Sequence, residues 1–182
     1  MPRGDVMKAV RRVAVSVTAI VFSLISVAPV AAADPTTHTK AEVDAARGQA
    51  GCPPFQADPV LTDVSQRTAH EVDDYVRHAA RNLPTTLDTD LLKALRETGY
   101  NTSNARLLNG YGDYRTGGAG DNEAKAIKGA VLQGWGFEVL SDCTLTKYGI
   151  SAINGGGSEG WPSTAPRTYS VVVVVLAGPS GR

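Results

Sequence analysis

Two cysteines are the first residues in this chain whose type and spacing indicate chemistry. Cys52 and Cys143 are its only cysteines, and a bond between them would close a loop of 143 − 52 = 91 residues. Two cysteines pair by default in an oxidising compartment outside the cytoplasm. The alternative is a free catalytic thiol, which requires a neighbouring base, and the sequence places no base beside either cysteine. We expect a disulfide.

Motifs of common catalytic and phosphate-binding sites give little support to an enzyme. The sequence holds no "H-E-x-x-H" metalloprotease motif. Glycines are frequent from Tyr100 to Gly120, but their spacing matches neither the Walker nor the dinucleotide-binding pattern. We interpret this stretch as a surface loop with a short strand around Arg106–Leu108. Asn101-Thr102-Ser103 has the form of a glycosylation acceptor, and we expect it to be unused because the N-terminal export signal is of a bacterial type.

The first 33 residues have the order of a secretory signal peptide, with a charged region, an apolar region and a small-residue cleavage site. The apolar run extends from Val13 to Val30, and Ala31-Ala32-Ala33 follows it. The alternative is an uncleaved membrane anchor, because this run is close to the shortest helix that spans a bilayer. The alanine triplet favours cleavage after Ala33. We therefore expect a protein of the extracellular space or cell envelope, with no membrane span in its mature form.

The charge balance of the mature chain argues against some partner classes. The full chain has 18 Lys and Arg and 18 Asp and Glu, and residues 1–33 hold four of the basic residues and one acidic residue, which leaves 14 − 17 = −3. The mature length of 182 − 33 = 149 residues suits a single domain. Nucleic acids are bound mainly through clustered Lys and Arg, and no such cluster exists. We expect no nucleic-acid partner.

Hydrophobic periodicity and capping residues predict four helices. Residues 34–39 are interpreted as a flexible polar leader, 40–178 as one domain and 179–182 as a tail. The first helix covers residues 40–50. The second begins with Asp58 as N-cap and Pro59 at the first helical position, and it extends to Ala79. The third begins at residue 89 or 90 and ends at Thr98, before Gly99.

Asp121 is expected to cap the fourth helix. Ile127, Val131, Trp135 and Glu138 recur at spacings of three or four residues, which places them on one face of that helix. Because this face is the apolar one, we expect Glu138 to be buried. A buried carboxylate needs a partner such as Arg or His, so Glu138 is a candidate for a functional role.

Two strands are predicted in the last third of the chain, over Leu145–Ala152 and Thr168–Ala177, with a Gly/Ser/Pro-rich loop from 154 to 166 between them. The second strand contains five consecutive valines, Val171–Val175. A strand that is apolar on both faces must be covered on both faces. We therefore predict a three-layer α-β-α sandwich, in which helices cover both faces of a central sheet.

Seven short segments share the order and form of the motifs of one known family: Val43–Arg47, Gly51–Phe55, Asp58–Leu61, Gly120–Asn122, Ala130–Trp135, Tyr148–Ile150 and Tyr169–Val174. In this order they resemble the opening helix, the "G-x-P-P-L" turn, the second helix, the "G-E-N" motif, the "A-V-x-x-W" helix and the last two strands of the CAP superfamily. These are cysteine-rich secretory, antigen 5 and pathogenesis-related proteins. The resemblance is to an exported bacterial branch, and it implies an α+β fold with a small, mostly antiparallel sheet.

The resemblance also implies a set of candidate metal ligands. Many members hold two histidines and two acidic residues around a central cleft. In this chain the corresponding residues are His78, Asp121 and Glu138, while the second histidine has no counterpart because all three histidines lie at or before residue 78. Three ligands would hold a divalent metal only weakly. The alternative for His78 is a residue near a helix C-terminus, and the alternative for Asp121 is a helix cap.

Three functions remain open on these grounds. We expect a non-catalytic extracellular module, without an assigned cofactor, that binds a small apolar or lipid ligand or a protein partner in a degenerate cleft. The first alternative is a weak metal-assisted hydrolase that uses His78 and Glu138. The second is a surface interaction protein without a pocket, which a wide separation of His78, Asp121 and Glu138 would favour.

Overall fold

The computed structural model of the chain describes residues 34–85, 88–118, 120–132, 135–156 and 168–181. Within these ranges the elements are α1 (Pro35–Gln49), β1 (Gln56–Ala57), α2 (Pro59–Val76), α3 (Asp88–Glu97), β2 (Ala105–Asp113), α4 (Asn122–Val131), α5 (Gly136–Leu140), β3 (Lys147–Gly156) and β4 (Thr168–Ala177). The predicted signal peptide and most of the predicted 154–166 loop lie outside the described residues. None of the helices in these ranges is both long and apolar enough to cross a bilayer.

The described strands form one four-stranded mixed sheet in the order β1-β3-β4-β2. Strand β4 is central and pairs antiparallel with both β3 and β2. The two-residue strand β1 pairs parallel with the start of β3. The predicted α+β class and the mostly antiparallel sheet are confirmed.

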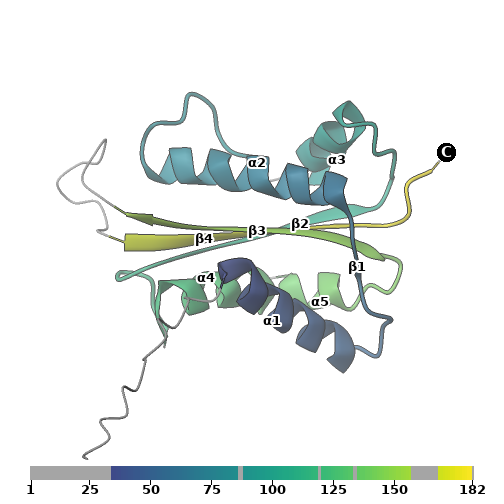
Figure 1. The fold of residues 1–182 in the computed structure, drawn as a ribbon, viewed down its shortest axis with the longest axis horizontal. Helices are drawn as coiled ribbons and strands as arrows, with labels where there is room; N and C mark the ends of the chain where they lie inside the picture. Colours follow the sequence, from purple (N-terminus) through teal and green to yellow (C-terminus); the bar gives the residue numbers. More distant parts are fainter. Residues whose placement is uncertain (1–33, 86–87, 119, 133–134, 157–167, 182) are drawn as a thin grey trace, which may run out of the picture. The chain divides into compact units, whose positions relative to one another are not determined.

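The valine run of β4 is buried on both faces of the sheet. Val171, Val173 and Val175 pack with apolar residues of α2 and α3, whereas Val172 and Val174 pack with those of α1 and α4. Because side chains alternate along a strand, each face receives every second residue of the run. Figure 1 shows α2 and α3 on one face of the sheet and α1, α4 and α5 on the other. The prediction that helices would cover both faces of this strand agrees with this packing.

Helix α1 begins earlier than predicted. Residues 35–39, predicted as part of a flexible leader, form its first turns. Asp34 is the N-cap and its side chain accepts a hydrogen bond from the Thr36 N–H, 2.9 Å away, while Pro35 occupies the first helical position. Thr39 is fully buried and its hydroxyl donates to the Pro35 carbonyl. The segment was predicted to be flexible because it is polar, although it contains an N-cap residue and a proline at the first helical position.

Helices α2 and α3 follow their sequence signals. Asp58 caps α2 by accepting from the backbone N–H groups of Val60 and Leu61, and α2 ends at Val76, three residues before the predicted end. Helix α3 is followed by Gly99, whose φ of 82° lies in the left-handed region that glycine adopts without strain. Both helices were predicted because capping is a local interaction.

Strand β2 is longer than predicted and corrects the interpretation of the glycine-rich stretch as a surface loop. It includes Gly110 and Gly112, both of which pair with β4. A Cβ atom at Gly110 would collide with the Ala126 carbonyl, and one at Gly112 would collide with the Asn122 carbonyl. These glycines therefore allow the α4 backbone to lie directly against the sheet. They indicate close packing and not a flexible loop.

The fourth predicted helix is two helices. Helix α4 ends at Val131, and α5 begins at Gly136 after a turn. A Cβ at Gly136 would lie 2.6 Å from the Ala130 carbonyl oxygen, so this glycine lets the chain turn back closely against α4. The helical periodicity that placed Trp135 and Glu138 on the buried face therefore does not continue past α4. Trp135 is 74% exposed and Glu138 is exposed, so the prediction of a buried Glu138 is wrong.

The end of α1 is joined to the loop after α5 by a disulfide and a buried arginine. Cys52 and Cys143 form the predicted bond, with Cα atoms 5.3 Å apart. Beside it, Arg47 is only 2% exposed. Its guanidinium donates to four backbone carbonyls, those of Pro53 (3.0 Å), Leu140 (3.0 Å), Asp142 (2.8 Å) and Leu145 (2.7 Å). The guanidinium carbon also lies 4.1 Å from the centre of the Phe55 ring.

Candidate functional site

The three residues expected around a metal lie on elements that cover opposite faces of the sheet. Asp121 caps α4 and Glu138 lies in α5, and the apolar residues of these helices pack on one face. His78 follows α2, which packs on the other face. All three side chains are exposed. The structure therefore does not bring His78 together with the two carboxylates.

His78 terminates α2 as a left-handed residue. Its φ is 58°, and the next residue, Ala79, donates its N–H to the Asp74 carbonyl at 2.8 Å. This 6→1 backbone bond closes the helix end as in a Schellman motif. A residue near a helix end was the alternative interpretation of His78, and this geometry agrees with it.

Asp121 has the same kind of local role at the start of α4. Its Oδ1 accepts from the Ala124 N–H at 2.9 Å, as predicted for an N-cap. Across the described ranges, no three His, Cys, Asp or Glu side chains lie close enough together to hold a metal ion. Two of the three candidate ligands therefore lie at helix ends, where His78 adopts the left-handed conformation after α2 and the Asp121 side chain satisfies a free backbone N–H of α4.

A groove between α1 and α4 brings Asp121 together with residues that the sequence did not single out. Its cavity volume is about 410 Å³. Described residues of both helices and of the turn after α4 line it: His38, Ala41, Glu42, Asp121, Glu123, Ala124, Ile127, Lys128 and Leu132. The lining combines apolar residues, Ala41, Ala124, Ile127 and Leu132, with charged ones, Glu42, Asp121, Glu123 and Lys128. Of the exposed or half-exposed acids here, only Asp121 was predicted as a site residue.

His38 and Glu123 join the two helices at this groove. The His38 Nδ1 and the Glu123 Oε1 are 2.6 Å apart, and the Glu123 side chain is 18% exposed. His38 lies in the segment that the sequence suggested to be a leader, so nothing indicated that it would face α4. Its position follows only from the early start of α1.

Large apolar side chains are exposed where α4 turns into α5. Leu132 is 53% exposed, Trp135 74% and Phe137 47%. Leu132 also lines the groove. Isolated exposed apolar residues are normal on protein surfaces, but several together mark interaction surfaces. We call Leu132, Trp135 and Phe137 the α4–α5 apolar patch.

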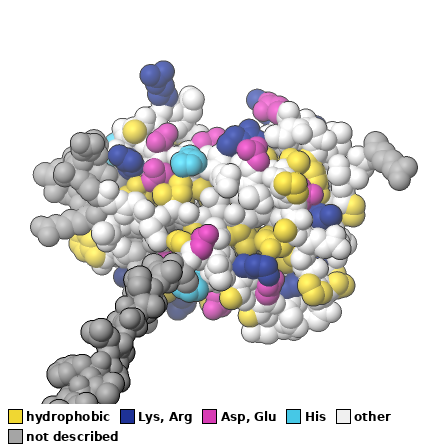
Figure 2. Space-filling view, in the orientation of Figure 1, with side chains coloured by type: hydrophobic (Ala, Val, Ile, Leu, Met, Phe, Trp, Pro, Cys, Tyr) yellow, Lys and Arg dark blue, Asp and Glu magenta, His cyan; other side chains and the backbone are white. Residues whose placement is uncertain are grey.

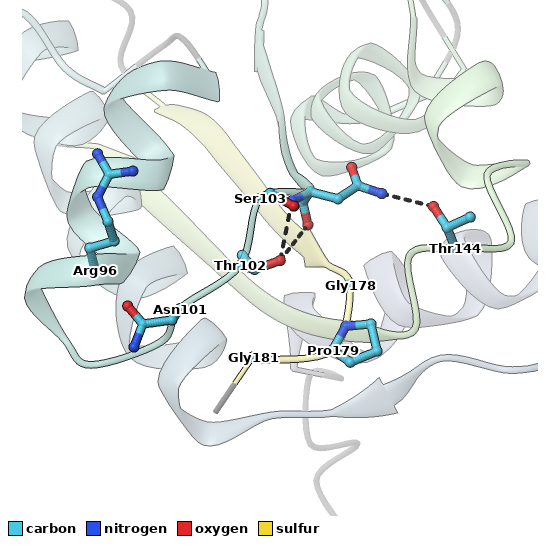
Figure 3. A pocket seen from close by; sticks show the side chains of 9 residues that line it. Arg96, Asn101, Thr102, Ser103, Thr144, Gly178, Pro179 and Gly181 are labelled. Atoms are coloured by element: carbon cyan, nitrogen blue, oxygen red, sulfur yellow. Dashed lines mark hydrogen bonds between the residues drawn. The ribbon is translucent and has the colours of Figure 1, made fainter.

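A second cavity, of about 520 Å³, lies where the chain enters β2 and leaves β4. Figure 3 shows the hydrogen bonds of Thr102 and Thr144 in its wall. The Asn104 side chain donates to the Thr144 hydroxyl at 2.7 Å, and the Gly181 N–H donates to the Asn101 carbonyl at 2.7 Å. The predicted tail is therefore attached to the domain here. The polar groups that line this cavity mostly form hydrogen bonds with one another. This favours a structural role, in which the cavity residues hold the chain end against the domain.

Two tyrosines, the buried Tyr169 and the half-buried Tyr111, belong to a polar cluster near the end of α2. The Tyr169 hydroxyl donates to the Asp73 carboxylate, and the Tyr111 hydroxyl donates to Asp113 Oδ2 at 3.0 Å. The two rings stack with centres 6.1 Å apart. Burial, and then the hydrogen bond to the carboxylate, raises the pKa of each tyrosine well above its ordinary value. Both hydroxyls remain protonated donors, which suits a structural role.

A "G-x-S-x-G" sequence occurs at residues 156–160. This pattern marks the nucleophile of some hydrolases when it turns a strand into a helix. All but its first glycine lie outside the described residues. The described strands on either side, β3 and β4, pair antiparallel, which differs from the strand–turn–helix setting that the motif requires.

The visible face of the molecule mixes acidic and basic side chains, as Figure 2 shows, with no large area of one sign. This distribution agrees with the lack of a basic cluster in the sequence. No family model, curated protein or solved structure was found to match the chain.

Proposed function

We propose that this chain is an exported CAP-like module that binds a ligand in the groove between α1 and α4 and does not catalyse a reaction. The observation that carries the proposal is the groove itself, whose lining combines Ala41, Ala124, Ile127 and Leu132 with charged residues. Ligand sites are typically concave and mainly apolar, with a few polar groups that orient the ligand. The groove has this composition.

The CAP-like part of the proposal rests on the ordered motifs and on the layers. A three-layer α-β-α sandwich is the fold that the resemblance implies, and helices on both sides of a mostly antiparallel sheet support it. The disulfide supports an oxidising location outside the cytoplasm. The export signal remains a proposal from the sequence.

The positions of His78 and Glu138 do not support the hydrolase alternative. It requires His78 and Glu138 to act on one water molecule, and these residues belong to elements on opposite faces of the sheet. Their separation was expected to favour a surface interaction protein without a pocket. The α4–α5 apolar patch supports that second candidate, and both candidates place the contact surface on the α1/α4 side.

The groove can be tested with Nile red, a neutral dye whose fluorescence rises in apolar surroundings. We expect the oxidised protein beginning at Asp34 to enhance this fluorescence, and the variants Ala41→Trp and Ala124→Trp to lose most of the enhancement. Both alanines are exposed, so the new rings fill the groove and spare the core. Leu83→Trp is the control, since Leu83 is 81% exposed and absent from the groove lining. Equal fluorescence of all four proteins would refute a binding groove.

A further inference from the structure

The charged residues around the α1/α4 groove carry an excess of negative charge. Glu42, Asp121 and Glu123 contribute three carboxylates, whereas Lys128 contributes the single ammonium group among the described lining residues. His38 is already hydrogen-bonded to Glu123. A fatty acid or an anionic lipid headgroup would meet repulsion here, because like charges disfavour association. A cationic ligand would be attracted.

Two carboxylates at the groove have oxygens that an incoming cation can reach. Glu42 is exposed, and no described residue forms a hydrogen bond or ion pair with it. Asp121 uses only Oδ1 to cap α4, in its bond to the Ala124 N–H. Carboxylate oxygens of both residues can therefore accept hydrogen bonds from Lys or Arg of a ligand.

Large apolar side chains are exposed at the end of the groove and just after it in the chain. Leu132 lines the groove and is 53% exposed, and two more large apolar side chains, Trp135 and Phe137, are exposed within the next five residues of the chain. Trp and Phe are enriched in protein–protein interfaces and often carry much of their binding energy. Several large exposed apolar side chains near the end of α4, together with the carboxylates of the groove, match a polypeptide better than a single small molecule.

We infer that the occupant of the α1/α4 groove is a basic amphipathic segment of a partner protein, with large apolar side chains on one face and Lys or Arg beside them. Its apolar face lies over Ala41, Ala124 and the α4–α5 apolar patch, and its cations face Glu42 and Asp121. A helix laid into an apolar groove is a recurring mode of peptide recognition. The inference rests on the proposed function and adds the chemistry of the ligand.

The test uses two fluorescein-labelled synthetic peptides of equal length with the same amphipathic helical pattern, one of Leu and Lys and the other of Leu and Glu. Fluorescence anisotropy at low salt measures their binding to the oxidised protein. We expect only the Leu/Lys peptide to bind, and its affinity to fall in about 0.5 M NaCl, where screening is strong. The Glu42→Lys variant should bind the Leu/Lys peptide at least about fivefold more weakly than the unmodified protein does.

Glu97→Lys is the control, because Glu97 is also an exposed glutamate but lies on α3, which covers the opposite face, where its ion-pair partner is Lys93. It makes the same change in net charge and should leave the affinity within about twofold, since screening confines surface charge effects to short range. Trp135→Ser should weaken binding without changing the charge. Equal binding of both peptides, or equal effects of Glu42→Lys and Glu97→Lys, would overturn the inference.

The Nile red measurement separates this inference from the proposed function. If Ala124→Trp abolishes dye binding but leaves peptide binding unchanged, the groove binds apolar ligands and the peptide inference is wrong. If Ala124→Trp changes neither dye nor peptide binding, both are wrong. Loss of both, together with selectivity for the Leu/Lys peptide, supports both.

Discussion

Replacing Arg47 with Met should strongly destabilise the protein, because the side chain is buried and bonded entirely to backbone carbonyls. Asp142 O keeps a second donor, the Leu145 N–H at 3.1 Å, so the carbonyls of Pro53, Leu140 and Leu145 lose the most. An unsatisfied buried acceptor costs about 1 to 3 kcal/mol. Taking the lower part of that range for three carbonyls gives about 3 to 5 kcal/mol in the free energy of unfolding.

Arg47→Lys should cost about half as much, because an ammonium group is a point donor and cannot reach all of these carbonyls in a fork geometry. Burial lowers the pKa of Arg47, but a guanidinium remains charged in proteins, so four carbonyl dipoles stabilise a cation without an ion pair in the core. This is the reason that Met, of similar length, is not a neutral replacement.

Urea denaturation of the oxidised protein, followed by far-ultraviolet circular dichroism, measures both changes. Arg67→Met is the control, because Arg67 is about half exposed and its ion pair with Asp63 spans 3.2 Å on the surface of α2. It should cost less than about 1 kcal/mol. A value for Arg47→Met that lies within 1 kcal/mol of the control, at an unchanged denaturant slope, would refute the conclusion that the Arg47 hydrogen bonds stabilise the contact between α1 and the loop after α5.

The remaining predictions concern the disulfide, a helix end, a glycine and a tyrosine. Changing Cys52 and Cys143 together to Ser should lower the free energy of unfolding by at most about 4 to 5 kcal/mol, the chain-entropy limit for this loop, and an unchanged urea midpoint would contradict it. His78→Gly should keep or raise the melting temperature, because glycine adopts the left-handed conformation without cost; a clear loss of stability would point to another role for the imidazole. Gly110→Ala should destabilise by about 2 kcal/mol or more, because the new Cβ collides with the α4 backbone, and calorimetry would show whether it is tolerated. Tyr169→Phe should cost most below pH 10, the ordinary tyrosine pKa being 10.0, and less as pH rises above it. The raised folded pKa means that the unfolded chain then loses its proton first, so a cost that grows with pH above 10 would contradict the hydrogen bond.

The candidate site could be predicted only in part, because the sequence patterns used, capping residues and helical periodicity, describe one helix at a time. Contacts between helices that are distant in the chain leave no such pattern. Asp121 was recognised as a cap, and that role is confirmed. Glu138 was misplaced because the 3.6-residue period was extended through a turn, and the turn depends on the close contact of Gly136 with the end of α4. His38 was missed because its partner, Glu123, lies 85 residues away in the chain.

The amino-acid sequence by itself determined the features that depend on neighbours in the chain or on bulk hydrophobicity. Asp58-Pro59 starts α2, the valine run makes a strand covered on both faces, and the two cysteines pair. Only the tertiary structure decided the rest. Gly110 belongs to a strand because α4 packs against it, and Arg47 is buried because distant carbonyls surround it. The groove exists because the first turn of α1 lies beside α4, a contact between segments that no local pattern encodes.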